Sequence, residues 1–237
     1  MATSEDMNPA FSVIIPAHNE ENYIRKTLRS LQQQTYQNFE VIVVANGCTD
    51  KTEEIVKKRA DERLRILSLP KANVSVARNA GALNANGKLL LFLDADTQLA
   101  EDALQTIKDQ FADHHAIATT RVLPEPPQLK YKLLMSLKNT YNQTKLFKGF
   151  SGTVICRKQD FHEVNGYNPE LIVREHHDLR KKLEQKGTYA CIPTYATTSM
   201  RRFEQWSIPK AASFWIKQWG KQYLGKDLST TEYEKIR

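Results

Sequence analysis

Leu89-Leu90-Leu91-Phe92-Leu93-Asp94-Ala95-Asp96 places two carboxylates directly after a continuous apolar run. Such a run is typical of a strand that is buried on both faces of a parallel sheet. Two carboxylates at close range repel each other unless a cation lies nearby. Mg²⁺ and Mn²⁺ prefer hard oxygen ligands and also bind phosphate oxygens. The stretch therefore predicts a strand that ends in a divalent-metal site, with a solvated turn that caps the next helix as the alternative.

The residues before this strand repeat its pattern. Apolar runs occur at 11–15, 39–45 and 64–69, and segments with helical spacing separate them. We expect Asn19 to cap the first helix, and Asp50 with Glu53 resembles a capping box for the second. The order β-α-β-α-β-α-β predicts an open α/β sheet with right-handed crossovers, in which ligands lie beyond the carboxyl ends of the strands.

Composition narrows the class of protein. The chain has 237 residues, 41% of them hydrophobic, which suits one large domain or two merged halves. A formal net charge of +7 favours acidic partners, namely nucleic acid, an anionic membrane surface or phosphorylated small molecules. Three cysteines without CxxC spacing favour a reducing compartment rather than disulfides or zinc. Without a leader pattern or an apolar run of about 18 residues, the chain is expected to be soluble and cytoplasmic.

Four motifs, in this order, resemble those of the family-two glycosyltransferases: Val13-Ile14-Ile15-Pro16-Ala17-His18-Asn19-Glu20, Ala45-Asn46-Gly47-Cys48-Thr49-Asp50, Ala77-Arg78-Asn79-Ala80-Gly81 and Asp94-Ala95-Asp96. The resemblance covers roughly residues 11–202. It implies a GT-A fold and a nucleotide diphosphate sugar donor, UDP- or GDP-linked. It also implies a hexosyl transfer that inverts the anomeric configuration.

The resemblance assigns donor-binding roles by motif. It places Pro16, Ala17 and Glu20 in the nucleoside pocket, Asn46 at the base and Arg78 at the nucleotide. The diphosphate and its metal would be held by Asp94, Ala95 and Asp96. The family often has Asp-Asp-Gly-Ser where this chain has Asn46-Gly47-Cys48, so the identity of the base stays open. The plain alternatives are a turn at Asn46-Gly47 and a surface position for Arg78.

Gln98 extends the acidic motif. The run 94–98 is similar to the metal-binding run of the dolichol-phosphate sugar synthases, in which case the carbonyl of Gln98 would be a third oxygen ligand. A solvated glutamine early in a helix is the alternative.

The second half of the chain resembles the acceptor side of the same family. Glycines in 149–153 and 164–167 would let backbone and sugar approach closely, with Gly152 and Thr153 on the acceptor side. Where the family commonly has Glu-Asp-x-Asp, this chain has Glu175-His176-His177-Asp178.

This departure leaves several mechanisms open. His176 could be the base that takes the proton of the acceptor hydroxyl, with Glu175 and Asp178 orienting it or raising its pKa, or Glu175 could be the base itself. His176 or His177 could instead complete the metal shell. A lipid phosphate acceptor would need no base, and a charged helix start with surface caps is the structural alternative.

Arg202 is the last candidate for the donor site. Residues 198–203 look like a remnant of the Gln-x-x-Arg-Trp element of processive synthases, with Arg202-Phe203 at its end. The arginine pair 201–202 could clamp the donor diphosphate or an acceptor phosphate. An exposed salt-bridging pair of arginines is the alternative.

Pro124-Glu125-Pro126-Pro127 is the sharpest break in the chain. We therefore expect a nucleotide-sugar-binding half at 1–123, an acceptor-binding half of the same domain at 124–205 and a helical extension at 206–237. In the second half we expect a helix at 128–146, a strand at 151–156 and a helix at 177–186.

The extension combines aromatic and basic residues. Aromatic and aliphatic residues recur at helical spacing between lysines, which suits either an interfacial helix on an anionic membrane or a terminal helix that packs on its own domain. Aromatic and basic interleaving is also found in proteins that bind single-stranded nucleic acid, but no recognised module accompanies it here. The residues are Lys210, Ala212, Trp215, Ile216, Lys217, Trp219, Lys221, Tyr223 and Lys226.

Taken together, the sequence predicts a metal-dependent inverting glycosyltransferase that uses Mn²⁺ or Mg²⁺ and a glycan, polyprenyl-phosphate or small-molecule acceptor, with no nucleic-acid partner. Peripheral contact with the cytoplasmic membrane face is an option. A nucleotidyltransferase is disfavoured because its glycine-rich entrance loop is missing from residues 16–20. A catalytically silent nucleotide-sugar-binding protein and a membrane-associated scaffold remain as rivals from other classes.

Overall fold

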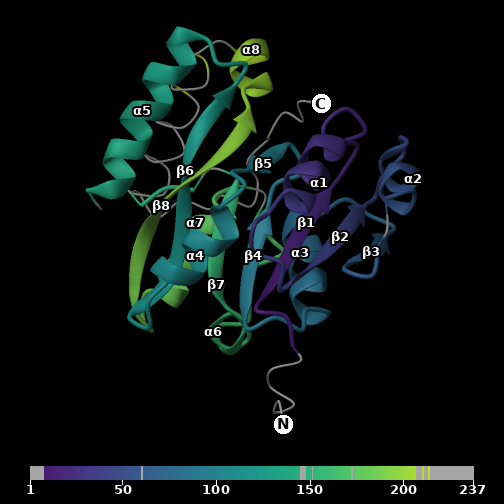
Figure 1. Ribbon diagram of the computed structural model, residues 1–237, viewed down its shortest axis with the longest axis horizontal. Helices are drawn as coiled ribbons and strands as arrows, with labels where there is room; N and C mark the ends of the chain where they lie inside the picture. The colour runs from purple at the N-terminus through teal and green to yellow at the C-terminus, as the bar shows by residue number, and fades with distance from the viewer. Residues whose placement is uncertain are drawn as a thin grey trace.

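A computed structural model describes residues 8–59, 61–144, 148–150, 152–171, 173–206, 210 and 213. The chain forms one eight-stranded sheet in the order β3-β2-β1-β4-β7-β6-β8-β5, with helices against both faces (Figure 1). In the described residues, no helix is both long and apolar enough to cross a membrane. The α/β fold that the sequence predicted is confirmed.

The first half follows the predicted alternation of strands and helices. Its strands are all parallel, with β1 between β2 and β4 and with β3 outside β2. Every residue of β2 is buried, because helices cover the sheet on both sides. The elements are β1 (Phe11–Ala17), α1 (Ile24–Gln32), β2 (Phe39–Asn46), α2 (Thr52–Lys57), β3 (Leu64–Leu69), α3 (Val74–Leu83) and β4 (Leu89–Leu93).

The two predicted helix caps are wrong. Tyr23 is the N-cap residue of α1, whereas Asn19 has a positive φ of 55° and its side chain accepts a hydrogen bond from the amide of Thr49, at 2.8 Å. Lys51 is the N-cap residue of α2, and Glu53 forms an ion pair with Lys57 instead of closing a capping box. The side chains of Asn19 and Asp50 join the loops that follow β1 and β2, because each accepts a hydrogen bond from a main-chain amide of the other loop.

The second half adds antiparallel and parallel strands to the same sheet. β7 runs antiparallel to both β4 and β6, and β6 runs parallel to β8. The elements are β5 (Thr97–Leu99), α4 (Ala103–Gln110), β6 (His115–Glu125), α5 (Leu129–Gln143), β7 (Thr153–Arg157), α6 (Lys158–Glu163), α7 (Glu175–Leu183), β8 (Thr188–Ser199) and α8 (Arg201–Trp206).

The elements predicted for this half are confirmed with shifted bounds: α5 for 128–146, β7 for 151–156 and α7 for 177–186. Strand β6 continues through Pro124 to Glu125, so the proline-rich break begins after the strand and not at residue 124. The division of the chain into two functional halves stays a prediction. The predicted C-terminal helix lies outside the described residues, apart from Lys210 and Ser213.

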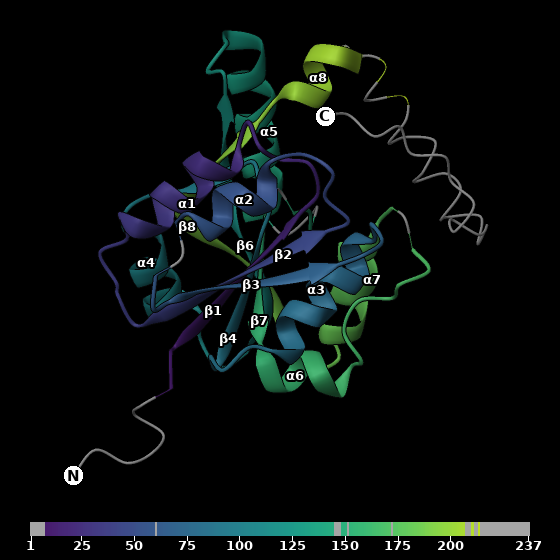
Figure 2. The same cartoon turned by 90° about the vertical axis from the view of Figure 1, so that its right-hand side faces the viewer.

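Two apolar layers hold the sheet, one on each face. Val13 and Ile15 of β1 pack with α1, α2 and α4, while Ile14, between them in the sequence, packs with α3, α6 and α7. A third cluster joins α5 and α8 to the far end of β6. Figure 2 shows the sheet between the two groups of helices. Alternate side chains of β1 thus belong to opposite cores.

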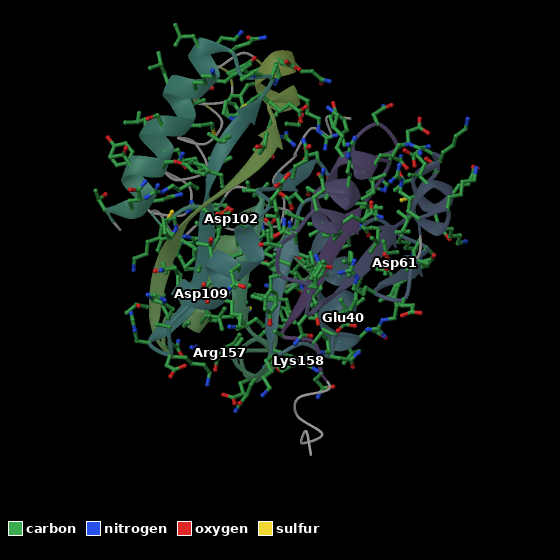
Figure 3. The ribbon with its side chains drawn as sticks, in the orientation of Figure 1. Glu40, Asp61, Asp102, Asp109, Arg157 and Lys158 are labelled. Atoms are coloured by element: carbon green, nitrogen blue, oxygen red, sulfur yellow. The ribbon has the colours of Figure 1, made fainter. Side chains whose placement is uncertain are left out.

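The amino ends of the parallel strands are closed by structural contacts. Glu40, at the start of β2, accepts hydrogen bonds from Ser12, Asn86 and Arg65. Arg157 and Lys158 donate to main-chain oxygens, Lys158 to Ala85 at 2.6 Å. Figure 3 labels Glu40, Arg157 and Lys158 near this end of the molecule. The opposite edge, where the parallel strands end, carries the acidic motifs.

Candidate active site at the carboxyl edge of the sheet

The loop after β2 organises the predicted base-binding region. Asn46, which is 4% exposed, accepts a hydrogen bond from the amide of Asn73 at 2.8 Å. Its main-chain oxygen lies 2.6 Å from Nδ1 of His18. Gly47 has a φ of +64°, and a Cβ there would lie 2.7 Å from the amide nitrogen of Ala72, so a side chain does not fit. The side-chain oxygen of Asn46 therefore holds the start of α3 in place.

Arg78 joins two acidic segments that are far apart in the sequence. It lies on α3, is 3% exposed, and donates through Nη2 to Asp94 at 3.1 Å and through Nη1 to Glu175 at 3.0 Å. Its guanidinium also lies over the ring of Tyr167, 5.2 Å from the centroid. Its Nε is buried and has no hydrogen-bond partner among the described residues. The surface alternative for Arg78 is therefore wrong.

A second arginine holds the other two carboxylates. Arg201, at the start of α8, donates to both oxygens of Glu20, at 2.8 and 2.7 Å, and lies 3.0 Å from Asp96. Burial raises the pKa of Asp96 to about 7; Arg201 opposes this shift, and Asp94 and Glu20 add to it. Even with Arg201 present, the cluster is short of positive charge.

Arg201 is a functional candidate that the sequence offered only as one member of an arginine pair. Its neighbour Arg202 was chosen instead, because the resemblance to the synthase motif aligned Arg202-Phe203 with Arg-Trp. Arg202 is half-buried, and its role at the donor stays a prediction. The signal for Arg201 was the arginine pair itself, since a sequence without a known register cannot say which of two neighbours points to the site.

The remaining predicted donor residues lie on the same edge. Pro16 and Ala17 end β1, and Ala95 is buried between the two aspartates, where its main-chain oxygen accepts from Thr27 at 2.7 Å. Gln98, in contrast, lies in β5, and its amide donates to Glu125 at 2.7 Å. The Gln98 side chain therefore hydrogen-bonds to a residue of β6 rather than to either of the two aspartates.

The chemistry of the donor set suits a divalent metal. Asp94 and Asp96 supply hard oxygen ligands, and the Asp94 side chain is 40% exposed. The pKa of Asp96 is raised mainly by burial, and the nearby carboxylates of Asp94 and Glu20 add to that shift. Among the described residues, no group of three or more His, Cys, Asp or Glu side chains could hold a metal without help from a ligand. A metal at these two aspartates would need further ligands besides the His, Cys, Asp and Glu side chains of the described residues, such as the oxygens of a diphosphate.

Helix α7 brings the predicted base cluster to the site. Arg174 precedes it with a φ of 64°, a turn that directs Glu175 toward Arg78. Asp178, one turn later, forms an ion pair with Lys182 at 2.8 Å. His177 lies 3.1 Å from Arg180, and burial, reinforced by that arginine, lowers its pKa to about 4. Of the four residues, Glu175 has the direct contact with the donor-side arginine.

His176 sits in an aromatic pocket. Its ring lies 5.6 Å from Phe150 and 5.5 Å from Tyr167, and Nδ1 is 3.0 Å from the hydroxyl of Tyr167. Burial, together with the charge of Arg78, lowers the pKa of His176 to about 3, so the expectation that the flanking acids raise it is wrong. Nε2 lies 3.7 Å from a carboxylate oxygen of Glu175, which favours the proton on Nε2 and leaves Nδ1 as the acceptor. At neutral pH, His176 is thus an uncharged ring whose lone pair faces Tyr167.

The predicted acceptor residues differ in what they do. Gly152 has a φ of +73°, its oxygen accepts from the amide of Asp94 at 2.9 Å, and a Cβ there would lie 2.4 Å from the hydroxyl of Thr97. Thr153 is 1% exposed, and its hydroxyl is 2.9 Å from that of Thr120. Gly152 therefore shapes the floor beneath Asp94, while the Thr153 hydroxyl belongs to a buried cluster. Ser151, between Phe150 and Gly152, lies outside the described residues.

Curated relatives resemble this chain over part of its length. GlyA, a glycosyltransferase of Streptococcus pneumoniae serotype 4, is 37% identical over 107 residues, which is 44% of this chain and 15% of that protein. Chondroitin synthase of Pasteurella multocida is 34% identical over 190 residues, which is 76% of this chain and 19% of the synthase. The chain thus spans less than a fifth of the length of either relative.

Solved structures share the fold. Residues 1–349 of Staphylococcus aureus TarS, in complex with UDP-GlcNAc, match with a TM-score of 0.62 and 22% identity, covering 81% of this chain and 58% of that one. A mannosyltransferase of Pyrobaculum calidifontis, in complex with GDP-Man and Mn²⁺, matches with a TM-score of 0.73 and 19% identity, covering 100% of this chain and 68% of the other. Both comparisons support the GT-A architecture.

The family comparison covers most of the chain. The family model described as Glycosyl transferase family 2 matches residues 12–204, a range that includes all four motifs and both arginine-centred clusters. The resemblance to dolichol-phosphate sugar synthases stays a prediction. Because more than half of its residues match that model, the chain belongs to glycosyl transferase family 2.

Proposed function

We propose that this chain transfers a sugar from a nucleotide diphosphate sugar to an acceptor hydroxyl, with inversion at the anomeric carbon. The observation that carries the proposal is the pair of arginine-centred clusters at one edge of the sheet. Arg78 with Asp94 and Glu175, and Arg201 with Asp96 and Glu20, bring two cations and four carboxylates together. Family membership supports the same reaction.

In the proposed reaction the arginines and the aspartates have different roles. Asp94 and Asp96 would hold a Mn²⁺ or Mg²⁺ ion, which supplies charge neutralisation for the departing nucleoside diphosphate. Arg201 and Arg78 keep these carboxylates in position through charge-assisted hydrogen bonds. Asn46 and Gly47 shape the loop at the end of β2 on which the base of the nucleotide would rest.

Glu175 is the base that we propose. A carboxylate at this position would accept the proton of the acceptor hydroxyl as the oxygen attacks the anomeric carbon and the diphosphate leaves with the bonding electrons. His176 is a weaker candidate, because its pKa of about 3 and its contact with Tyr167 leave it neutral with its lone pair engaged. Asp178 pairs with Lys182 of its own helix, whereas the partner of Glu175 is the donor-side Arg78. His176 then serves to hold Tyr167 beneath Arg78.

A catalytically silent sugar-nucleotide-binding protein is the second candidate. The observation that favours it is His176, which stands where the family commonly has an acid and which is uncharged at neutral pH. Such a protein would bind the same nucleotide at the same edge but would not turn over the donor. The comparison with solved structures suggests the ligands to try, since one of those proteins was seen with UDP-GlcNAc and another with GDP-Man.

The test is a thermal-shift and donor-turnover screen of the purified protein against UDP-GlcNAc, GDP-Man and the free diphosphates, with Mn²⁺ and with chelator. Stabilisation by one nucleotide together with slow release of its sugar supports the transferase. Stabilisation without turnover supports the silent binder. Stabilisation by none of them contradicts both.

A matched pair of variants makes this screen specific. Asp96→Asn should abolish turnover, whereas Asp102→Asn changes an exposed carboxylate six residues further along the chain (Figure 3) and should keep it. Equal activity in the two variants would remove the acidic motif from the mechanism.

A further inference from the structure

The outer face of α5 carries a row of exposed apolar side chains. Leu129, Leu133, Leu137 and Tyr141 follow one another at intervals of four residues and are 73, 63, 54 and 46% exposed. Side chains at this spacing lie along one face of a helix. Of the eight large hydrophobic residues that are exposed in the described part of the chain, these four make up half. We call them the α5 stripe.

The helix that carries the stripe is firmly attached through its other face. Tyr131, Met135 and Asn139 are buried against β6, and Asn139 donates to and accepts from the backbone of Val122, at 2.9 Å in each direction. Figure 1 shows α5 at the outer side of the molecule, beside the far end of β6. The exposure of the stripe is therefore a property of a docked helix with a buried inner face.

The charge on α5 has a single sign. Its sequence, LKYKLLMSLKNTYNQ, contains three lysines and neither aspartate nor glutamate. Lys130 and Lys132 are exposed beside the stripe. The whole chain carries a formal net charge of +7. Apolar residues flanked by lysines without acidic residues are typical of helices that lie on a membrane interface.

We propose that the α5 stripe docks on the surface of an anionic phospholipid membrane. The three leucines would enter the boundary between headgroups and acyl chains, and Lys130 and Lys132 would meet the acidic headgroups. A second copy of this chain fits less well, because two such helices would bring their lysines together. A standard interface between proteins also involves roughly 20–30 residues on each side, many more than the stripe offers.

Helix α5 also contacts the acceptor side of the candidate site. Lys138, on α5, donates through Nζ to the main-chain oxygen of Phe150 at 3.0 Å, and the ring of Phe150 lies 5.6 Å from His176. The helix that carries the stripe is thus held against the segment that packs on His176. The docking itself does not depend on catalysis and is tested separately from it.

The test is flotation of the 237-residue chain with vesicles of phosphatidylcholine alone and of phosphatidylcholine mixed with phosphatidylglycerol. The wild-type chain should float with the mixed vesicles and stay at the bottom with phosphatidylcholine alone. Leu133→Asp with Leu137→Asp should lower the bound fraction at least tenfold. The control is Leu83→Asp, which changes a leucine that is 75% exposed on α3 and should bind as the wild type does.

A charge pair repeats the test without touching the leucines. Lys130→Glu with Lys132→Glu should also weaken binding, whereas Lys51→Glu with Lys88→Glu changes two exposed lysines away from α5 by the same total charge and should weaken it much less. If circular dichroism shows that the Leu133→Asp, Leu137→Asp variant does not fold, the comparison of the two lysine variants tests the proposal in its place.

Three results would overturn the proposal. The wild-type chain could bind neither kind of vesicle. The α5 variants could bind as their controls do, which would move the contact to another segment, residues 207–237 included. Light scattering could show a dimer that the aspartate variant converts to a monomer, which would make a second copy the occupant of the stripe.

Discussion

At the scale of single residues, the two neighbouring arginines differ: Arg201 makes the contacts with the acidic cluster, whereas Arg202 is the one that matched the sequence motif. They are adjacent in the sequence, but Arg201 binds Glu20 and Asp96 while its guanidinium lies 4.6 Å from the centre of the Tyr23 ring. Planar contacts of this kind are specific to the guanidinium group and its fork of donors. Loss of Arg201 would leave two half-buried carboxylates facing each other.

We therefore expect Arg201→Ala to impair donor binding more than Arg202→Ala. Without Arg201, repulsion between Glu20 and Asp96 should spread the acidic cluster, and donor turnover should fall by about 100-fold, the loss expected when a bidentate charged contact worth about 2–3 kcal/mol is removed. Arg201→Lys should recover only part of this, because an ammonium cannot reach both oxygens of Glu20 in the same geometry. The measurement is kcat/KM for donor turnover in the three variants. Equal losses in Arg201→Ala and Arg202→Ala would contradict the assignment.

The second prediction at the residue scale is that His176 makes the free energy of unfolding depend on pH. Its folded-state pKa of about 3 lies below the value of 6.5 expected in the unfolded chain. Between these values the unfolded state binds a proton that the folded state does not, so stability is lost as the pH falls below 6.5. On going from pH 6.5 to 5 this group alone should lower the free energy of unfolding by about 2 kcal/mol.

The check is urea unfolding of the wild type and of His176→Asn at pH 7 and pH 5. The variant should lose less stability than the wild type between these two pH values, whatever its stability at pH 7. If the two proteins lose the same amount, His176 is already charged in the folded state and the aromatic pocket does not hold it neutral.

Most residues of the candidate site could be named from the sequence, but which of their side chains contact one another could not. The motif order brought Arg78, Asp94 and Glu175 into one hypothesis, and the structure places them in contact. The sequence could not show that the Thr153 hydroxyl turns into the sheet or that Gln98 binds Glu125. Those partners lie on strands whose register is decided by tertiary packing, which a pattern along the chain does not contain.

At the scale of elements, the contact between α3 and β1 decides whether Arg78 reaches the site. Gly81 lies one turn after Arg78, and a Cβ at that position would lie 2.3 Å from a methyl carbon of Ile14. The glycine of the Ala-Arg-Asn-Ala-Gly motif thus lets the helix approach the strand closely. Gly81 therefore has a packing role: it lets α3 lie close enough to β1 for Arg78, three positions earlier, to reach the site.

Gly81→Ala should therefore destabilise the protein. Overpacking of this kind costs about 1–3 kcal/mol, more than the roughly 0.5–1 kcal/mol that alanine gains over glycine within a helix. Ile14→Ala should also destabilise, by leaving a cavity, but the double variant should lose less than the sum of the two single losses because the added methyl group then has room. Urea unfolding of the four proteins gives the coupling energy. A more stable Gly81→Ala protein would show that α3 can move away from β1 without cost.

The elements themselves were predictable to different degrees. The parallel strands and their helices followed from apolar runs and helical spacing, because both faces of that sheet are covered and each run is long. The short strand β5 and the long pairing of β6 with β8 did not, since β5 has three residues and β8 joins the sheet from a distant part of the sequence. The Asn19 cap failed because its side chain bonds across to the loop after β2, and the predicted capping box failed because Glu53 pairs with Lys57. Asp50 accepts both from the amide of Thr52, at the start of α2, and from that of Glu21 in the other loop.

At the scale of the whole molecule, a single sheet joins the two halves of the chain. β4, from the first half, pairs along its whole length with β7, from the second. Phe92 of β4 packs against Phe161 and Tyr167, with ring centroids at 5.1 and 5.2 Å. Arg201 then returns to Glu20 across 181 positions of sequence. A nucleotide-binding half and an acceptor-binding half would therefore share one core even if their functions are separate.

This arrangement predicts that the two halves unfold together. Phe92→Ala removes a side chain that is 2% exposed at the β4–β7 junction and should lower the free energy of unfolding by about 3–5 kcal/mol. Because the junction belongs to both halves, amide hydrogens of β2 and of β6 should lose protection from exchange by a similar factor when exchange occurs through global unfolding. Hydrogen–deuterium exchange followed by mass spectrometry measures both strands in one experiment. If β6 loses protection while β2 keeps that of the wild type, the halves are separate cooperative units, and the boundary after residue 123 is a folding boundary as well as a functional one.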